Sequence, residues 1–259
     1  MTRLRIAIAL LAAVIATPAA FAAPVFAGPV SPDLLPDLQM APLFNLYVST
    51  TPGGAKRLRF GTLVYNVGDG AIEVRGRKRV GNEMTRVVQF VYRGDGTGHA
   101  ITKPNATLHY SGDGHDHFHI ERFIRTTLKP MPGNPATTQT RRGRKIGFCL
   151  VDTVQMHTNV PPNATSNPAY FGCGNSSSQN VRIGISVGWG DVYTPELAFQ
   201  AIDVTGLPAG AYKICATVNP SGLWTEKASN SANNSYWLEL TLDAANNQVA
   251  VTGSGDTPC

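Results

Sequence analysis

Apolar and polar residues alternate with a period of two along much of the chain between Pro32 and Leu242. The alternation is clearest in Leu58–Tyr65 and Val87–Tyr92, and it is typical of β-strands with one buried and one exposed face. Shorter apolar segments bounded by Gly, Pro, Asn or Asp predict further strands. These are Ala71–Arg75, His115–Phe123, Lys145–Val151, Ala198–Val204, Tyr212–Val218, Tyr236–Leu242 and Gln248–Thr252.

Helical periodicity is nearly absent, so the sequence predicts an all-β protein. About nine or ten short strands separated by turns favour an antiparallel β-sandwich with long irregular loops and very little helix. No fixed-period repeat indicates a propeller. The longest irregular stretches are Lys129–Arg144 and Asn159–Asn180, and loops of such length in a compact domain are usually functional or mobile. The strand pattern resumes after each loop, which favours one domain over residues 32–259.

Composition agrees with a turn-rich globular chain and restricts the partners. The 259 residues include 26 Gly and 18 Pro, and 42% are hydrophobic, which is enough for a buried core. Lys and Arg number 22 against 17 Asp and Glu. Arg3 and Arg5 lie in a segment that we expect to be removed, so 20 − 17 leaves a net charge of +3. This excess is too small to indicate a nucleic-acid partner.

The N-terminus has the pattern of a secretory signal. Two arginines precede an apolar run from Ile6 to Ile15, and Ala20-Phe21-Ala22 forms an A-x-A cleavage site. We expect a signal peptide over residues 1–22 and a short lead over 23–31. The run is shorter than the about 20 residues that span a membrane, so we expect a secreted or periplasmic protein with no membrane insertion after signal removal.

The four cysteines fit an oxidising compartment. Their number is even and none forms C-x-x-C, which favours two disulfides over a zinc site. We expect Cys149 to pair with Cys173 and Cys215 with Cys259, with a bridge from Cys259 to another chain as the alternative for the second pair.

Three of the six histidines, His115, His117 and His119, occupy alternate positions. On a strand they share one face, where three imidazoles can converge on a transition metal, with Asp113 or Asp116 as a partner for a ring N–H. A polar solvent-facing strand edge, or a zinc site without catalytic role, is the alternative. Weaker candidates for a site role are His99, His109 and His157.

Further motifs make the chain resemble a known family. Residues Lys145–Thr153 match K-x-x-F-C-L-x-D-T, Asp191–Tyr193 match D-x-Y, and Gln200–Thr205 match Q-x-I-D-[IV]-T. With the H-x-H-x-H motif, these patches resemble the lysyl oxidase family of copper-dependent amine oxidases. Weaker echoes are Pro36-Asp37-Leu38, Gly210-Ala211-Tyr212, Asn219-Pro220 and Asn233-Asn234.

The resemblance implies Cu(II) on the three histidines and a lysine tyrosylquinone made from Lys145 and Tyr193. It also implies a primary-amine substrate, with protein lysine side chains as one candidate, which molecular oxygen converts to an aldehyde with release of ammonia and hydrogen peroxide. We assign the base to Asp191, because it lies two residues from Tyr193 and so on the same face of a strand. The site residues are thus Lys145, Tyr193 and Asp191 with the copper ligands.

Each of these catalytic assignments has an alternative in which the residue has only a structural role. Lys145 ends a run of charged residues that could form a solvent-exposed loop, and Tyr193 could be a packing residue with a solvent-exposed hydroxyl. We expect Asp152 and Asp203 to hold turns, and Phe118, Phe148 and Phe199 to lie in the core.

The chain also departs from animal members of the family. It has fewer cysteines, and Arg125 stands near the position of a histidine that follows their copper motif. A calcium site near Asn233 and Asn234 is a further candidate. The alternative function is a non-enzymatic secreted copper-binding protein, whereas a zinc hydrolase would need an H-E-x-x-H motif, which the sequence lacks.

Overall fold

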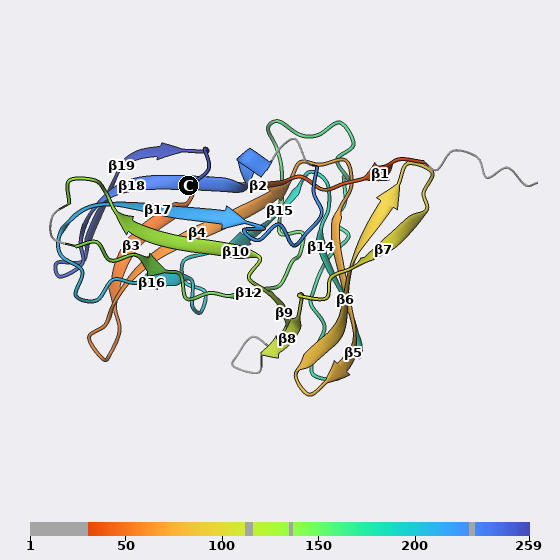
Figure 1. The fold of residues 1–259 in the computed structure, drawn as a ribbon, viewed down its shortest axis with the longest axis horizontal. Helices are drawn as coiled ribbons and strands as arrows, with labels where there is room; N and C mark the ends of the chain where they lie inside the picture. Colours follow the sequence, from red (N-terminus) through yellow and green to blue (C-terminus); the bar gives the residue numbers. More distant parts are fainter. Residues whose placement is uncertain (1–30, 112–115, 135–136, 228–230) are drawn as a thin grey trace, which may run out of the picture. The chain divides into compact units, whose positions relative to one another are not determined.

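The computed structural model describes residues 31–111, 116–134, 137–227 and 231–259. These residues contain nineteen β-strands and one 3-10 helix, η1 (Ser231–Asn234), and every pairing between strands is antiparallel (Figure 1). The prediction of an all-β fold is therefore confirmed. The signal peptide predicted for residues 1–22, residues 23–30 of the predicted lead, and His115 lie outside the described residues.

The largest sheet carries the histidine strand. Its eight strands are β1 (Asp33–Leu34), β5 (Ile72–Val80), β6 (Glu83–Arg93), β7 (Gly98–Thr102), β8 (Leu108–Ser111), β9 (His117–Glu121), β12 (Gly147–Phe148) and β14 (Asn180–Ile185). Their order is β12-β9-β8-β6-β5-β14, and β1 and β7 also pair with β6. The histidine strand β9 thus lies between β8 and the short strand β12.

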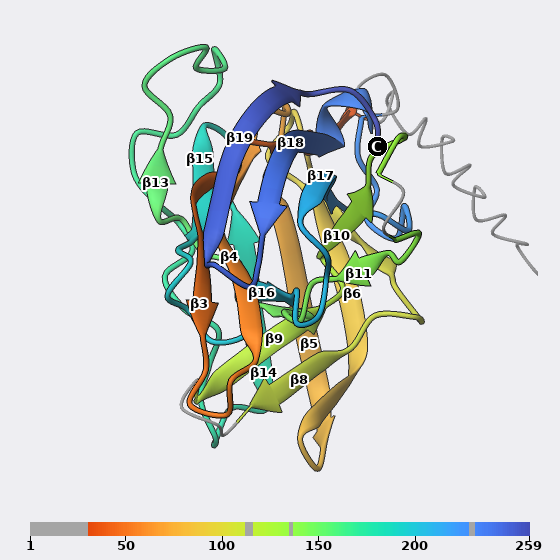
Figure 2. The same ribbon diagram turned by 90° about the vertical axis from the view of Figure 1, so that its left-hand side faces the viewer.

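Two further sheets complete the fold. The six-stranded sheet contains β2 (Leu38–Met40), β3 (Phe44–Thr50), β4 (Lys56–Asn66), β13 (Val154–Gln155), β15 (Trp189–Tyr193) and β16 (Ala201–Asp203). The five-stranded sheet contains β10 (Ile124–Pro130), β11 (Arg141–Arg142), β17 (Gly210–Val218), β18 (Ser235–Asp243) and β19 (Gln248–Gly255). Figure 2 shows β19 beside β3, so these two sheets meet along that edge.

All three sheets contribute to one buried cluster, in which Val74 of β5, Leu58 of β4 and Ile214 of β17 are fully buried. Alternation produces this core directly, as in β6, where Val87 and Val91 point inward. Burial of apolar surface is the main favourable contribution to folding, so the period-two pattern decides which face of each strand packs.

Three predicted strands are shorter than expected, and the described strand within His115–Phe123 is β9 (His117–Glu121). The segment Lys145–Val151 is a strand only at Gly147–Phe148, and Ala198–Val204 only at Ala201–Asp203. Strand β12 ends at Phe148 because the next two carbonyl groups are not paired with β9. The carbonyl of Cys149 accepts a hydrogen bond from the Tyr193 hydroxyl, and the carbonyl of Leu150 accepts one from the amide of Gly184.

The prediction that Phe199 lies in the core is wrong. Its side chain is 47% exposed, and its backbone has a φ of 64°, in the left-handed region that non-glycine residues rarely adopt. This turn points the ring away from the core. Phe118 and Phe148 are buried as predicted.

Both predicted disulfides are present. Cys149 bonds to Cys173 and Cys215 to Cys259, with Cα–Cα distances of 5.7 and 6.2 Å. The first fixes the long irregular segment after β13 to the residue that follows β12. Asp152 reinforces it, because its carboxylate accepts from the amides of Ala169, Tyr170 and Ser186.

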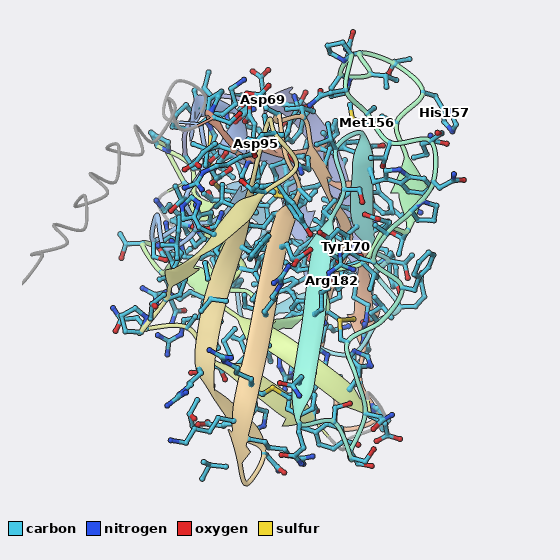
Figure 3. The ribbon with its side chains drawn as sticks, turned by 90° about the vertical axis from the view of Figure 1, so that its right-hand side faces the viewer. Asp69, Asp95, Met156, His157, Tyr170 and Arg182 are labelled. Atoms are coloured by element: carbon cyan, nitrogen blue, oxygen red, sulfur yellow. A yellow bond between two sulfur atoms is a disulfide. The ribbon has the colours of Figure 1, made fainter. Side chains whose placement is uncertain are left out.

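A buried carboxylate ties the same segment to the largest sheet. Glu73 of β5 is fully buried and accepts hydrogen bonds from the hydroxyls of Tyr92 and Tyr170 at 2.8 and 2.7 Å. The guanidinium of Arg182 donates to it at 2.8 Å and stacks on Tyr170, with the carbon of the guanidinium 4.4 Å from the ring centroid (Figure 3). Arg75 is the remaining cation.

The contacts group Ser31–Cys259 into one unit. Among the described residues, no helix has both the length and the apolar character needed to cross a membrane.

Candidate active site

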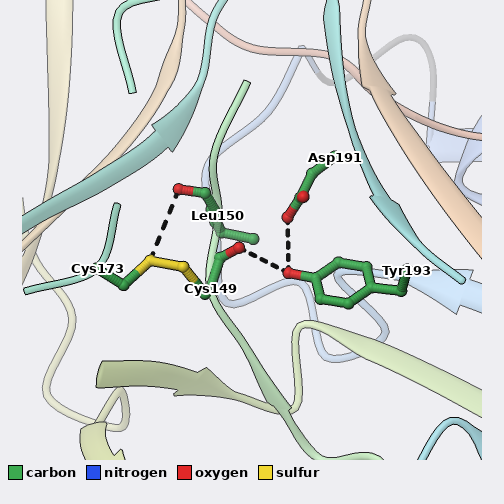
Figure 4. Close-up of a disulfide and its surroundings, with 5 residues drawn as sticks. All are labelled: Cys149, Leu150, Cys173, Asp191 and Tyr193. Carbon is green, nitrogen blue, oxygen red and sulfur yellow. Dashed lines mark hydrogen bonds between the residues drawn. A yellow bond between two sulfur atoms is a disulfide. The ribbon is translucent and has the colours of Figure 1, made fainter. Parts of the chain in front are cut away.

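Tyr193 lies at the end of β15, with its ring in the core and its hydroxyl in a polar niche (Figure 4). The hydroxyl is 2.6 Å from Oδ2 of Asp191 and 2.7 Å from the carbonyl oxygen of Cys149. Asp191 is two residues away on the same strand face, as the alternation predicted.

Burial perturbs both groups. It raises the pKa of the Asp191 carboxyl well above its ordinary value, and the hydrogen bond from Tyr193, an amide hydrogen bond from Val151 and the charge of Lys145 only partly oppose it. Burial also raises the pKa of the Tyr193 hydroxyl, and the nearby negative charge of Asp191 adds to this effect. A carboxyl with a raised pKa is suited to exchange protons near neutral pH.

Lys145 approaches the tyrosine from the segment between β11 and β12. Its Nζ lies 5.0 Å from the centroid of the Tyr193 ring and 5.4 Å from that of Phe148. The two rings meet edge to face, with centroids 5.2 Å apart. The structure thus brings together the lysine and the tyrosine that the sequence singled out, and Phe148 forms a wall beside both.

The two described histidines of the alternating motif share a face of β9. The ring centroids of His117 and His119 are 4.5 Å apart, and His119 is nearly buried. Gly147 on β12 makes room for His119, because a Cβ at that glycine would lie 2.9 Å from the Cβ of His119. Two imidazoles on one strand face fit two ligand positions of a copper site, whereas His115 lies outside the described residues.

A cavity of about 300 Å³ joins the lysine to the histidine strand. Lys145, His119 and Phe199 line it, together with His109, which stands directly opposite His119 on β8. From the sequence alone, His109 is only a weaker candidate for a site role, and Phe199 is expected in the core. Only the pairing of β8 with β9 and the left-handed turn bring them here, and neither leaves a local signal in the sequence.

A second polar cluster lies near η1. Asn233 donates to Asp37, and Asn219 and Asn234 both donate to Glu226. The side-chain oxygens of Asn233 and Asn234 are buried without a hydrogen-bond partner. Buried polar atoms are rarely left unpaired, and two carboxylates with two amide oxygens are the donor set that Ca²⁺ prefers. These residues therefore fit calcium.

Comparison with known proteins decides the family. A family model described as lysyl oxidase matches residues 66–252, more than half of the chain. The chain belongs to the lysyl oxidase family. Curated relatives are lysyl oxidase homolog 2 of Gallus gallus, 33% identical over 110 residues, and lysyl oxidase homolog 4 of Bos taurus, 32% identical over 107 residues.

These matches cover 42% and 41% of this chain and 12% of each relative. Lysyl oxidase homolog 2 of Xenopus tropicalis matches over 52% of the chain and 16% of its own length, at 29% identity. The chain thus spans a small part of the length of the curated relatives that it matches. The family model agrees with the resemblance of the sequence motifs to lysyl oxidases.

Among the described residues, no group of three histidine, cysteine or acidic side chains is arranged to hold a metal. The copper assignment remains a prediction that depends on His115.

Proposed function

We propose that this chain is a copper-dependent amine oxidase that converts a primary amine to an aldehyde. The reaction consumes RCH₂NH₂, O₂ and H₂O and yields RCHO, NH₃ and H₂O₂. The observation that carries this proposal is the position of the Lys145 amine, 5.0 Å from the centroid of the Tyr193 ring. Family membership supports it, since lysyl oxidases build their organic cofactor from such a pair.

Lys145 and Tyr193 would form lysine tyrosylquinone, which supplies an electrophilic carbonyl for the amine and then passes the substrate's electrons to oxygen. In this scheme Lys145 reaches the ring by turning its flexible side chain. Asp191 accepts the hydrogen bond from the Tyr193 hydroxyl and, with its raised pKa, is the base for the carbon-bound proton of the substrate. Phe148 excludes water from one side of the ring.

His115, His117 and His119 would hold Cu(II), which supplies the redox chemistry with oxygen that cofactor formation requires. Calcium at Asp37, Glu226, Asn233 and Asn234 would have a structural role. Disulfides persist in oxidising compartments, so the two bridges support an exported, secreted or periplasmic protein.

The test is a search for the cofactor in copper-loaded, aerated protein. Phenylhydrazine should give a coloured adduct, and a tryptic digest should contain one covalently joined species that holds both Lys145 and Tyr193. In Tyr193→Phe the cross-link should disappear while copper remains bound, because the ring lacks the phenolic oxygen. In Lys145→Ala peroxide release with primary amines should fall to background.

His117→Ala is the control for the metal, and it should lose stoichiometric Cu(II) after dialysis against a mild chelator. Separate, unmodified Lys145 and Tyr193 peptides after thorough copper loading would refute the enzyme. A protein that still bound copper through the histidines would then be a copper carrier.

A further inference from the structure

A basic groove opens beside the candidate site. Its volume is about 720 Å³, and it includes Lys145 in its lining. Arg122, Arg125 and Arg142 also line it, against a single acidic side chain, Glu121, among the described residues. The groove adjoins the 300 Å³ cavity, because Lys145, Glu121 and Ile146 line both.

The arginine charges in the groove are not neutralised by neighbours. Arg122, Arg125 and Arg142 are exposed, and in the part of the chain that the structure describes none of them has a carboxylate within ion-pair distance. By contrast, Arg57, Arg93 and other cations elsewhere pair with carboxylates. Clustered like charges raise the free energy of the free protein slightly and attract anions.

Strand pairing places two of these arginines side by side. Thr127 of β10 pairs with Arg142 of β11, and Arg125 lies two residues before Thr127 on the same face. Lys129, two residues after Thr127, extends this face with another exposed cation. Figure 2 shows β10 and β11 as neighbours. Arg125 and Arg142 of the basic surface are thus held close together by the register of two paired strands.

The charge has a consequence for a substrate amine, which is itself cationic in water. A basic rim repels a free amine and a polyamine, whereas it attracts an amine carried on an anionic molecule. The groove and cavity together also exceed what one amine needs, since pockets of about 300–1,000 Å³ hold ligands of drug size.

We propose that the substrate is an acidic peptide segment, with its lysine in the cavity beside His119 and Lys145 and its carboxylates on Arg125 and Arg142. This proposal rests on the proposed amine-oxidase function and names its substrate class. Arg122 lies on the same groove and contacts residues farther along the peptide.

Binding is measured first, without turnover, so that the surface is tested separately from the chemistry. Fluorescently labelled peptides of equal length carry norleucine in place of lysine, flanked by Glu, Gln or Lys. At low salt the Glu peptide should bind at least about tenfold more tightly than the Gln peptide, and added salt should weaken it as charges are screened. The Lys-flanked peptide should not bind.

The double variant Arg125→Glu with Arg142→Glu should reverse the order of the peptides. Arg125→Gln with Arg142→Gln should abolish the preference and serves if the first variant is unstable. The matched control is Arg77→Glu with Arg86→Glu, which makes the same charge change at two exposed arginines paired across β5 and β6. The control should keep the original order.

Turnover of the corresponding lysine peptides should follow the same order in kcat/KM. Equal binding of the Glu and Gln peptides, an undiminished preference in the Arg125→Gln, Arg142→Gln variant, or stronger binding of a sulfated oligosaccharide than of the Glu peptide would each overturn the proposal. Peptide binding without oxidation would refute the amine-oxidase function alone, whereas oxidation without a preference for acidic peptides would refute only this inference.

Discussion

Glu73 offers a direct test of the network that supports the candidate site. Its buried carboxylate accepts from two tyrosines and two arginines, and Glu73→Gln removes the charge while keeping the shape. Removing one partner of a buried ion pair costs about 3–5 kcal/mol. Arg75 and Arg182 are 41% and 47% exposed, so both turn partly to water, and we expect a loss of about 3 kcal/mol at neutral pH, the lower end of that range.

The loss should depend on pH with a definite sign. Burial by itself raises the pKa of Glu73, but hydrogen bonds from Tyr170, Tyr92 and Arg75 outweigh it, so the pKa lies below its ordinary value of 4.5. The native state then binds fewer protons than the unfolded state, and the stabilisation is complete above that ordinary value and disappears as pH falls through the lowered pKa.

Urea unfolding of both proteins at pH 7 and in a series below pH 4.5 measures this difference. The gap in free energy of unfolding should narrow toward acid. Glu239→Gln is the control, because its ion pair with Lys213 at 3.1 Å is about one-third exposed and should contribute less than about 1 kcal/mol. A gap at pH 7 no larger than that of Glu239→Gln, or one that does not change with pH, would refute the reasoning.

Three further outcomes are expected. Gly147→Ala should weaken copper binding about tenfold in a chelator competition, because its new methyl group lies 2.9 Å from the Cβ of His119. The control Gly53→Ala, where a Cβ meets nothing within 4 Å, should bind copper normally, and equal copper affinities of the two variants would show that the contact with His119 does not affect the metal site. Because a base must be deprotonated, kcat/KM should rise with pH through the raised pKa of Asp191. In Asp191→Asn kcat/KM should fall at least about 100-fold and lose this rise with pH, and a rise that persists in the variant would assign the base to another residue. Calcium at about a hundred times its Kd should raise the free energy of unfolding in urea by about 2.7 kcal/mol, and magnesium should not raise it. If Asn234→Ala retained this stabilisation by calcium, the cluster near η1 would be excluded as the calcium site.

The sequence by itself determined the fold class, since alternation with a period of two requires one buried face on each strand and leaves no helical alternative. It also determined which residue types are available for chemistry. The motif around Lys145, the pair Asp191 and Tyr193, and the alternating histidines could all be read along the chain, because each is a local pattern. The even number of cysteines favoured two disulfides, and the structure decided the pairing of Cys215 with Cys259 rather than with another chain.

The tertiary structure decided which of these residues come into contact. Only the antiparallel pairing of β15 with β4 and the departure of the chain from β12 bring Tyr193 under the Lys145 amine and give its hydroxyl the Cys149 carbonyl as a partner. The outward turn of Phe199 is likewise a backbone property that its apolar side chain conceals.

The basic groove and the buried cluster around Glu73 also exist only in three dimensions. Arg125 and Arg142 become neighbours through the register of β10 and β11, and Glu73 meets Tyr170 across a long loop. Local sequence encodes the periodicity of a strand, whereas charge clusters and hydrogen-bonded sites depend on contacts between distant segments, which packing selects by burying the greatest apolar area with the fewest unpaired polar groups.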